Sequence, residues 1–358
     1  MAYTTIDDPS AYFKVSLHTG NNTNDHAITF SDTDTTMQPA LVWIKSRDNT
    51  EEHMFTDSVR PINNYLASNN SDAEDVDSDN MQSLDSNGFT MGVRGSHNAN
   101  TIKYVAWCWK AGTTSGINAT GADVTPQAYS FDQTAGFSII DYHPTADTAN
   151  QEVPHGLAAV PHLIIAKTTN SAQDWAIYHH KNTAAPETDY LELNNNQATT
   201  DSDAWWSDTA PTSVLFTVGT ASETGGGNEN IAYCWTGKQG FSKFGSYTGN
   251  GNADGPFVYT GFRPAFILIK NTGAAEDWWI MDNKREGFNS SVSNRGNFGL
   301  QSNSTSSENT NQQADILSNG FKLTATSAEV NSSGATYIYA AFAEAPFVNS
   351  NGVPCNAR

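Results

Sequence analysis

Three stretches of the chain repeat one pattern of apolar and polar positions. In each stretch a proline opens a run of consecutive apolar residues that ends in a lysine. A residue with a ring side chain begins the next apolar segment eight positions after each lysine, and this equal spacing indicates an internal repeat. The three runs, with the ring residues that follow them, are 39–45 with His53, 161–167 with Trp175, and 264–270 with Trp278.

Each copy of the repeat is long enough to be a complete domain. Successive lysines of the pattern are 122 and 103 residues apart (167 − 45 and 270 − 167), whereas a solenoid unit has roughly 20–45 residues. We therefore predict tandem domains at residues 1–112, 113–236 and 237–347, followed by a tail at 348–358. Residues 113–135, rich in Gly, Ala, Thr and Ser, are predicted to be a linker at the start of the second domain.

The segments within each copy have the pattern of short β-strands. Aromatic and β-branched residues recur at short intervals, separated by loops rich in Asn, Gly, Ser and Asp. Two copies contain an Asn-Gly pair between apolar residues, at Asn87-Gly88 and Asn319-Gly320, which indicates a tight turn. Because no long stretch keeps a helical period, we predict an all-β fold of three tandem β-sandwich, jelly-roll-like domains.

The runs that end in lysine are apolar at consecutive positions rather than at alternate ones. Strands of this kind are buried on both faces, whereas a single two-layer sandwich covers only one face of each sheet. We therefore expect the second face to be covered by a neighbouring domain or by another subunit. A homo-oligomer, with a trimer favoured, is the form that the second alternative predicts.

The overall charge excludes two classes of partner. The 358 residues include 38 acidic and 18 basic side chains, which gives a formal net charge of −20. Binding to nucleic acid or to an anionic membrane depends on clustered Lys and Arg, so we expect neither partner. The chain has no apolar run long enough to span a bilayer, and its first residues lack the pattern of a secretory signal peptide.

The three cysteines do not form a disulfide framework, because their number is odd and small. Cys108 and Cys234 lie at matching positions of the closing strands, where the third copy is interpreted as having Phe342. A position that accepts Phe is a core position, so we expect buried free thiols there. Cys355, in the tail, receives no role.

An acidic segment is a weak candidate for calcium binding, since oxygen-rich loops bind hard cations. Its spacing does not fit an EF-hand, which needs a glycine and a glutamate at fixed positions, and a solvated loop is the favoured interpretation. The four carboxylates are Asp72, Asp75, Asp77 and Asp79.

Histidines are concentrated in the second copy, and a metal or acid–base site would require them to converge. The other copies carry no matching set, since position 179 corresponds to Asp57 and Asp282. Satisfied or exposed histidines are therefore favoured, and we predict no catalytic residue, no resident metal and no cofactor. The histidines in question are His155, His162, His179 and His180.

Two pairs of adjacent tryptophans are candidates for binding. Neighbouring strand residues point to opposite faces, so one ring of Trp205-Trp206 and one of Trp278-Trp279 could be exposed and contact a glycan or another subunit. A place in the core or in an interface is the favoured interpretation for all four. The polar residues before Trp205 make the first pair the better candidate.

Three segments carry a resemblance, covering nearly the whole chain, to a family of uncharacterised repeat-domain proteins common in marine tailed phages. The similar segments are residues 3–13, 247–255 and 343–348. Related repeats occur in longer phage proteins that look like tail fibres. The resemblance implies a structural protein of the virion, assembled in the host cytoplasm together with other virion proteins.

Two roles on the particle surface remain open: a tail-fibre or appendage protein that contacts host-surface glycans, and a decoration, cement or knob protein of the capsid. Two alternatives need no particle, namely a soluble lectin-like carbohydrate-binding module and a polysaccharide depolymerase. No motif for catalysis stands out in the sequence, so the expectation is a protein that is not an enzyme.

Overall fold

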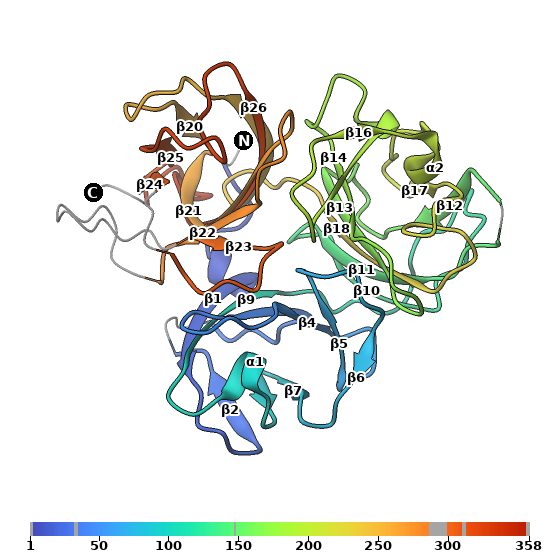
Figure 1. Cartoon of the computed structure of the whole chain (residues 1–358), viewed down its shortest axis with the longest axis horizontal. Helices are drawn as coiled ribbons and strands as arrows, with labels where there is room; N and C mark the ends of the chain where they lie inside the picture. The colour runs from blue at the N-terminus through green and yellow to red at the C-terminus, as the bar shows by residue number, and fades with distance from the viewer. Residues whose placement is uncertain (1–2, 32–34, 147, 286–298, 310–312, 356–358) are drawn as a thin grey trace.

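The computed structural model describes residues 3–31, 35–146, 148–285, 299–309 and 313–355. Nearly all of its regular structure is antiparallel β-sheet, so the predicted all-β fold is confirmed. Three large sheets lie around a common centre, as Figure 1 shows by the blue, green and orange-to-red parts of the chain. None of the helices in the described residues is long and apolar enough to cross a membrane. The helices are η1 (Pro9–Ala11), α1 (Gly95–Asn98), η2 (Pro186–Thr188) and α2 (Asp203–Trp206).

The first large sheet and its smaller companion are built from the first third of the chain. The large sheet has the order β1 (Phe13–Thr19), β9 (Lys103–Trp109), β3 (Leu41–Ser46), β4 (Met54–Asp57), β5 (Asn64–Ala67) and β6 (Asp75–Val76). The smaller sheet has the order β2 (His26–Thr29), β8 (Gly88–Met91) and β7 (Met81–Asp85).

The second large sheet begins inside the segment predicted to be a linker. Strand β10 (Ala128–Asp132) pairs with β11, so the end of the 113–135 segment is an edge strand, a correction to the sequence interpretation. The order of the large sheet is β10, β11 (Phe137–Tyr142), β18 (Asn230–Trp235), β13 (Leu163–Thr168), β14 (Ala176–His179), β15 (Asp189–Glu192) and β16 (Thr200–Asp201). The smaller sheet pairs β12 (Gln151–Pro154) with β17 (Leu215–Val218).

The third large sheet has the same order of opening, closing and lysine-ended strands as the other two. Its strands are β19 (Ser242–Thr248), β26 (Thr336–Pro346), β21 (Phe262–Asn271), β22 (Trp279–Asp282) and β23 (Leu300–Gln301). Its smaller companion has the order β20 (Phe257–Tyr259), β25 (Gly320–Leu323) and β24 (Ala314–Leu317).

One hydrophobic core is shared by the three large sheets. On β3, Leu41 and Trp43 belong to this central core, whereas Val42 and Ile44 face a separate core shared with the smaller sheet. Strand β13 divides its residues in the same way, because successive side chains point to opposite faces. The prediction that these strands are covered on both faces is confirmed, and the second cover is a neighbouring part of the same chain.

The pairing register corrects the match drawn for the cysteines. Cys108 pairs with Val42, Cys234 with Ile164, and the corresponding residue of the third sheet is Ala341, opposite Ile267. Phe342 instead matches the tryptophans that end β9 and β18, and a slip of one residue moves a side chain to the opposite face. Both thiols are buried, as predicted, and burial raises their pKa values.

Candidate functional site

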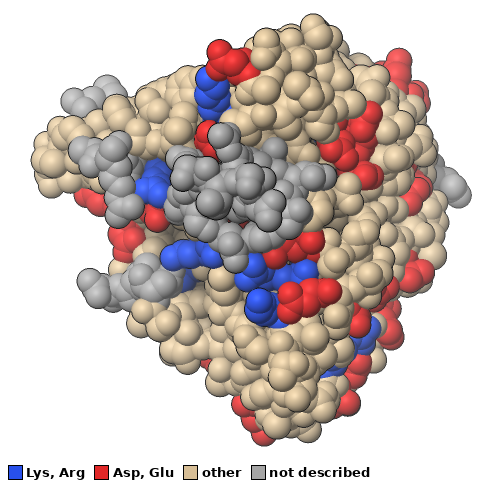
Figure 2. Space-filling model, turned by 60° about the vertical axis from the view of Figure 1, so that its left-hand side comes forward, with Lys and Arg blue, Asp and Glu red and all other residues tan. Residues whose placement is uncertain are grey.

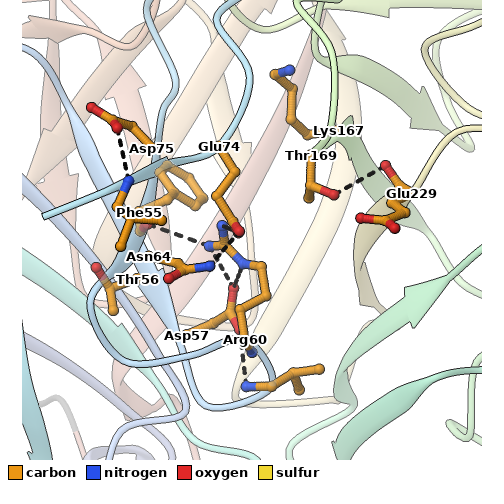
Figure 3. Close-up of polar contacts among 12 residues, drawn as sticks. Phe55, Thr56, Asp57, Arg60, Asn64, Glu74, Asp75, Lys167, Thr169 and Glu229 are labelled. Carbon is orange, nitrogen blue, oxygen red and sulfur yellow. Dashed lines mark hydrogen bonds and ion pairs between the residues drawn. The ribbon is translucent and has the colours of Figure 1, made fainter.

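Several of the buried polar groups lie where the large sheets meet. At the junction of the first and second sheets, Asp57 ends β4 and is only 1% exposed. It accepts hydrogen bonds from Nε of Arg60, at 2.8 Å, and from the hydroxyl of Tyr233 on β18, at 2.7 Å. The guanidinium of Arg60 also donates to Glu74, at 2.7 Å, and Figure 3 shows Arg60 between these two carboxylates.

Opposing effects act on the pKa of Asp57. Its burial would raise this pKa, but the charge of Arg60 and the hydrogen bonds from Arg60 and Tyr233 outweigh burial and hold the pKa below its ordinary value. The carboxylate is therefore ionised at neutral pH and is fully engaged by groups of its own junction. It has no access to solvent through which it could act on a substrate.

The junction of the third and first sheets uses the same arrangement. Asp282 accepts hydrogen bonds from Nε1 of Trp107, at 3.0 Å, and from Nε of Arg285, at 2.6 Å. Glu308 then joins the sheets, since it pairs with Arg285 at 3.1 Å and with Arg47 at 3.0 Å. Buried ion pairs of this kind are costly to break from one side, because the remaining charge is left without a partner.

A histidine takes the place of the aspartate at the junction of the second and third sheets. Nε2 of His179 donates to the carbonyl oxygen of Tyr339, at 3.1 Å, and Nδ1 accepts from the backbone N–H of Lys181. The three junction residues occupy equivalent places in their sheets, because each pairs with the first core residue of the neighbouring lysine-ended strand. The pairs are Asp57 with Leu41, His179 with Leu163 and Asp282 with Phe266. The match drawn between these positions from the sequence is therefore confirmed.

Three of the four candidate histidines converge, but as contacts between sheets. The rings of His162 and His180 stack with centroids 4.0 Å apart, and His180 donates to the carbonyl oxygen of Phe244 on β19. Burial lowers the pKa of His179 to about 3 and that of His162 to about 4, so both are neutral at pH 7. His155 lies elsewhere and contacts the carbonyl oxygen of Thr212.

The three lysines that end the apolar runs are buried and bonded to backbone carbonyl groups. Nζ of Lys45 donates to Thr305 at 3.0 Å and Nζ of Lys270 to Asn196 at 3.2 Å, in each case across a junction. Nζ of Lys167 donates to Thr168 at 2.7 Å. Burial lowers the pKa of each lysine to about 8, but none is exposed to a reactant.

The four candidate calcium ligands do not converge. Asp75 accepts a hydrogen bond from the hydroxyl of Tyr65, and Asp77 forms an ion pair with Arg94. Asp79 lies in an exposed turn, and Asp72 lies in an exposed segment without regular structure. Within the described residues, no three His, Cys, Asp or Glu side chains are placed to hold a metal ion together.

All four tryptophan rings are buried, as the favoured interpretation expects, so neither pair exposes a ring to a glycan. Trp205 and Trp206 lie in helix α2 rather than in a strand, and the ring of Trp205 stacks on Tyr190 with centroids 3.7 Å apart. Nε1 of Trp278 donates to the carbonyl oxygen of Glu192 on the second sheet, and Trp279 lies on β22. Covered strand faces leave neither ring of this second pair open to a glycan.

A groove of about 390 Å³ lies beside the junction of the second and third sheets, and the sequence interpretation missed it. Its walls include Tyr3, His162, Gln239, Lys243 and Tyr259, which come from distant parts of the chain. The available signal was the strand 257–259, where two aromatic residues flank a valine and so share one face.

Basic side chains are few in this chain, 18 against 38 acidic ones. Figure 2 shows a face on which Lys and Arg form small groups beside Asp and Glu, and wide areas carry neither charge.

Neither a curated protein nor a solved structure matches the chain. Residues 8–346 match the family described as a domain of unknown function, DUF7483, and the chain therefore belongs to this family.

Proposed function

We propose that the chain is a structural protein on the surface of a tailed-phage virion, built from three tandem β-sandwich repeats. The observation that carries the proposal is the use of the buried polar groups. Three buried side chains could serve acid–base chemistry in an open cleft, but each forms a hydrogen bond between two sheets instead. They are Asp57, His179 and Asp282. This is the arrangement of a rigid scaffold.

The shared core supports the same proposal. Each pair of large sheets meets through aromatic contacts, such as Trp109 with Trp235 and Phe13 with Phe342. Interiors packed in this way resist deformation, and a net charge of −20 keeps a protein soluble at high local concentration. Both properties suit a component that is displayed in many copies on a particle.

The phage assignment rests on the resemblance of residues 3–13, 247–255 and 343–348, and particles are the place to test it. Virions of a phage whose genome encodes this chain should be purified by density-gradient centrifugation. Mass spectrometry should then find the chain in them at a fixed ratio to the major capsid protein. Fab fragments against the chain, seen by electron microscopy, should then label either the head or the tail. Recovery of the chain only in the soluble fraction of the lysate would overturn the proposal.

The fold removes one reason for the homo-oligomer, with a trimer favoured, that the sequence predicts. A second subunit was one of two ways to cover the second face of the apolar strands, and the central core covers that face within one chain. The association that we propose is therefore with other virion proteins, and the mass of the isolated chain decides whether it also joins copies of itself.

A further inference from the structure

Two exposed aromatic residues stand side by side on one strand. Phe257 and Tyr259 are 48% and 47% exposed, while Val258 between them is buried, so both rings lie on the same face of β20. Few large apolar side chains of the described residues are exposed to this extent. A pair of exposed rings beside a groove marks an interaction site.

We propose that the groove beside Tyr259 binds a saccharide, with a pyranose ring stacked on the Tyr259 side chain. The ring of Tyr259 is already fixed in place. Its hydroxyl lies 3.2 Å from that of Tyr3, and Nζ of Lys243 donates to its backbone oxygen at 2.7 Å. A ring that is held before binding loses little conformational entropy when a ligand arrives.

The lining also includes His162, which offers a hydrogen-bond donor. Nδ1 of His162 accepts from the backbone N–H of Gly237, at 3.0 Å. Because burial lowers the pKa of His162 to about 4, the ring is neutral at pH 7, and its one proton must then be on Nε2. Stacking on His180 holds the ring in place, so Nε2–H is a positioned donor on the wall of the groove.

The chemistry of the lining favours a sugar over other ligands. The lining contains no Asp or Glu, although the chain has 38 acidic residues. It combines an aromatic surface with a small number of polar groups, among them the exposed Gln239. Such a surface receives the C–H face of a pyranose, while the polar groups bond its hydroxyls and fix its orientation. A nucleobase could also stack, but the strong negative charge of the chain disfavours its phosphates.

This inference deepens the proposed function, because a saccharide would be the host-surface ligand of a particle protein. The two are separable by experiment. Binding is measured on the isolated full-length chain, whatever its place on a virion, and failure to bind sugars would leave the particle assay unaffected.

The test is a glycan array that carries neutral and uronic-acid-containing oligosaccharides, followed by calorimetric titration of the sugars that bind. Y259A should weaken binding at least tenfold, about 1.4 kcal/mol, whereas Y259F, which keeps the ring, should change it by less than about threefold. Y129A, on the far edge strand β10, is the matched control and should bind like the wild type. Circular dichroism checks that each variant is folded.

Saturation-transfer NMR on the wild-type chain gives a second measurement that needs no variant. The C–H protons of the bound sugar should receive magnetisation from aromatic protons of the protein, and Y259A should abolish the transfer to at least one of them. Absence of binding to every oligosaccharide on the array would overturn the proposal. Binding that Y259A leaves unchanged would overturn it equally, since the sugar would then be held elsewhere.

Discussion

The hydroxyl of Tyr233, on the second large sheet, donates a 2.7 Å hydrogen bond to the carboxylate of Asp57, on the first. Both groups are buried, and Arg60 contacts both of them. The bond joins segments that are 176 residues apart in the chain. It is therefore a contact between sheets, and its loss should be felt as a loss of global stability.

Replacing Tyr233 by phenylalanine should destabilise the protein by about 1–3 kcal/mol, the usual cost of removing a hydrogen bond from a buried charged group. The free energy of unfolding from urea titration measures this loss. Y339F is the control, because the Tyr339 hydroxyl has no hydrogen-bond partner among the described residues and should lose less. Equal losses in the two variants would show that the bond to Asp57 contributes nothing specific.

Asp57 also predicts how stability depends on pH. Because its pKa is lower in the folded protein than in the unfolded chain, its contribution is present above the ordinary aspartate pKa of about 4 and is lost as the pH falls. D57N should be less stable than the wild type at pH 7 by about 3–5 kcal/mol, since the buried Arg60 loses one of its two carboxylate partners and keeps only Glu74.

The difference between wild type and D57N should then shrink between pH 5 and pH 3, measured by urea denaturation at each pH. D189N, an aspartate at the start of β15 that lies outside the junction, serves as the control. A difference that stays constant down to pH 3 would contradict the low pKa assigned to Asp57.

The strands and their double coverage could be predicted from the sequence because both depend on local pattern. Runs of consecutive apolar residues can only be stable when both faces are covered, and residues 41–44 show this alternation between two cores. The match of position 179 with Asp57 and Asp282 also followed from spacing, because strand pairing preserves equal intervals.

Features that depend on distant segments could not be predicted in this way. The carbonyl group that receives Lys45 belongs to Thr305, 260 residues along the chain, and Tyr259 is fixed by Tyr3. Helix α2 escaped detection because one short turn has no periodicity to read, and there Trp205 packs against Tyr190. The match of Cys108 with Phe342 failed since a one-residue slip leaves an apolar strand looking the same.

The buried lysines predict a rise in stability under alkaline conditions. Their pKa values are about 8 in the folded protein and about 10.5 when exposed, so the unfolded chain binds more protons between these values. Stability should therefore increase from pH 8 to pH 10, by an amount of order 1 kcal/mol for each lysine. NMR titration of the Cε resonances, assigned by single Lys-to-Met variants, measures the pKa values directly.

Urea titrations of K270M and the wild type at pH 8 and pH 10 test the link to stability. The free energy of unfolding should rise less between these pH values in K270M than in the wild type, because the variant lacks Lys270. Titration of all three buried lysines near the ordinary lysine value of about 10.4 would contradict the role that we assign to burial.

The shared core predicts the mass of the protein in solution. Each large sheet has its second face covered inside one chain, so the described residues leave no apolar face of a large sheet for a sister chain to cover. We expect sedimentation equilibrium to give one chain of 38.7 kDa at micromolar concentration. W235A, which removes a ring at the centre of the shared core, should lower the free energy of unfolding by about 3–5 kcal/mol without any dependence on protein concentration. A wild-type mass three times as large, or stability that rises with protein concentration, would show that sister chains complete the fold and would restore the trimer.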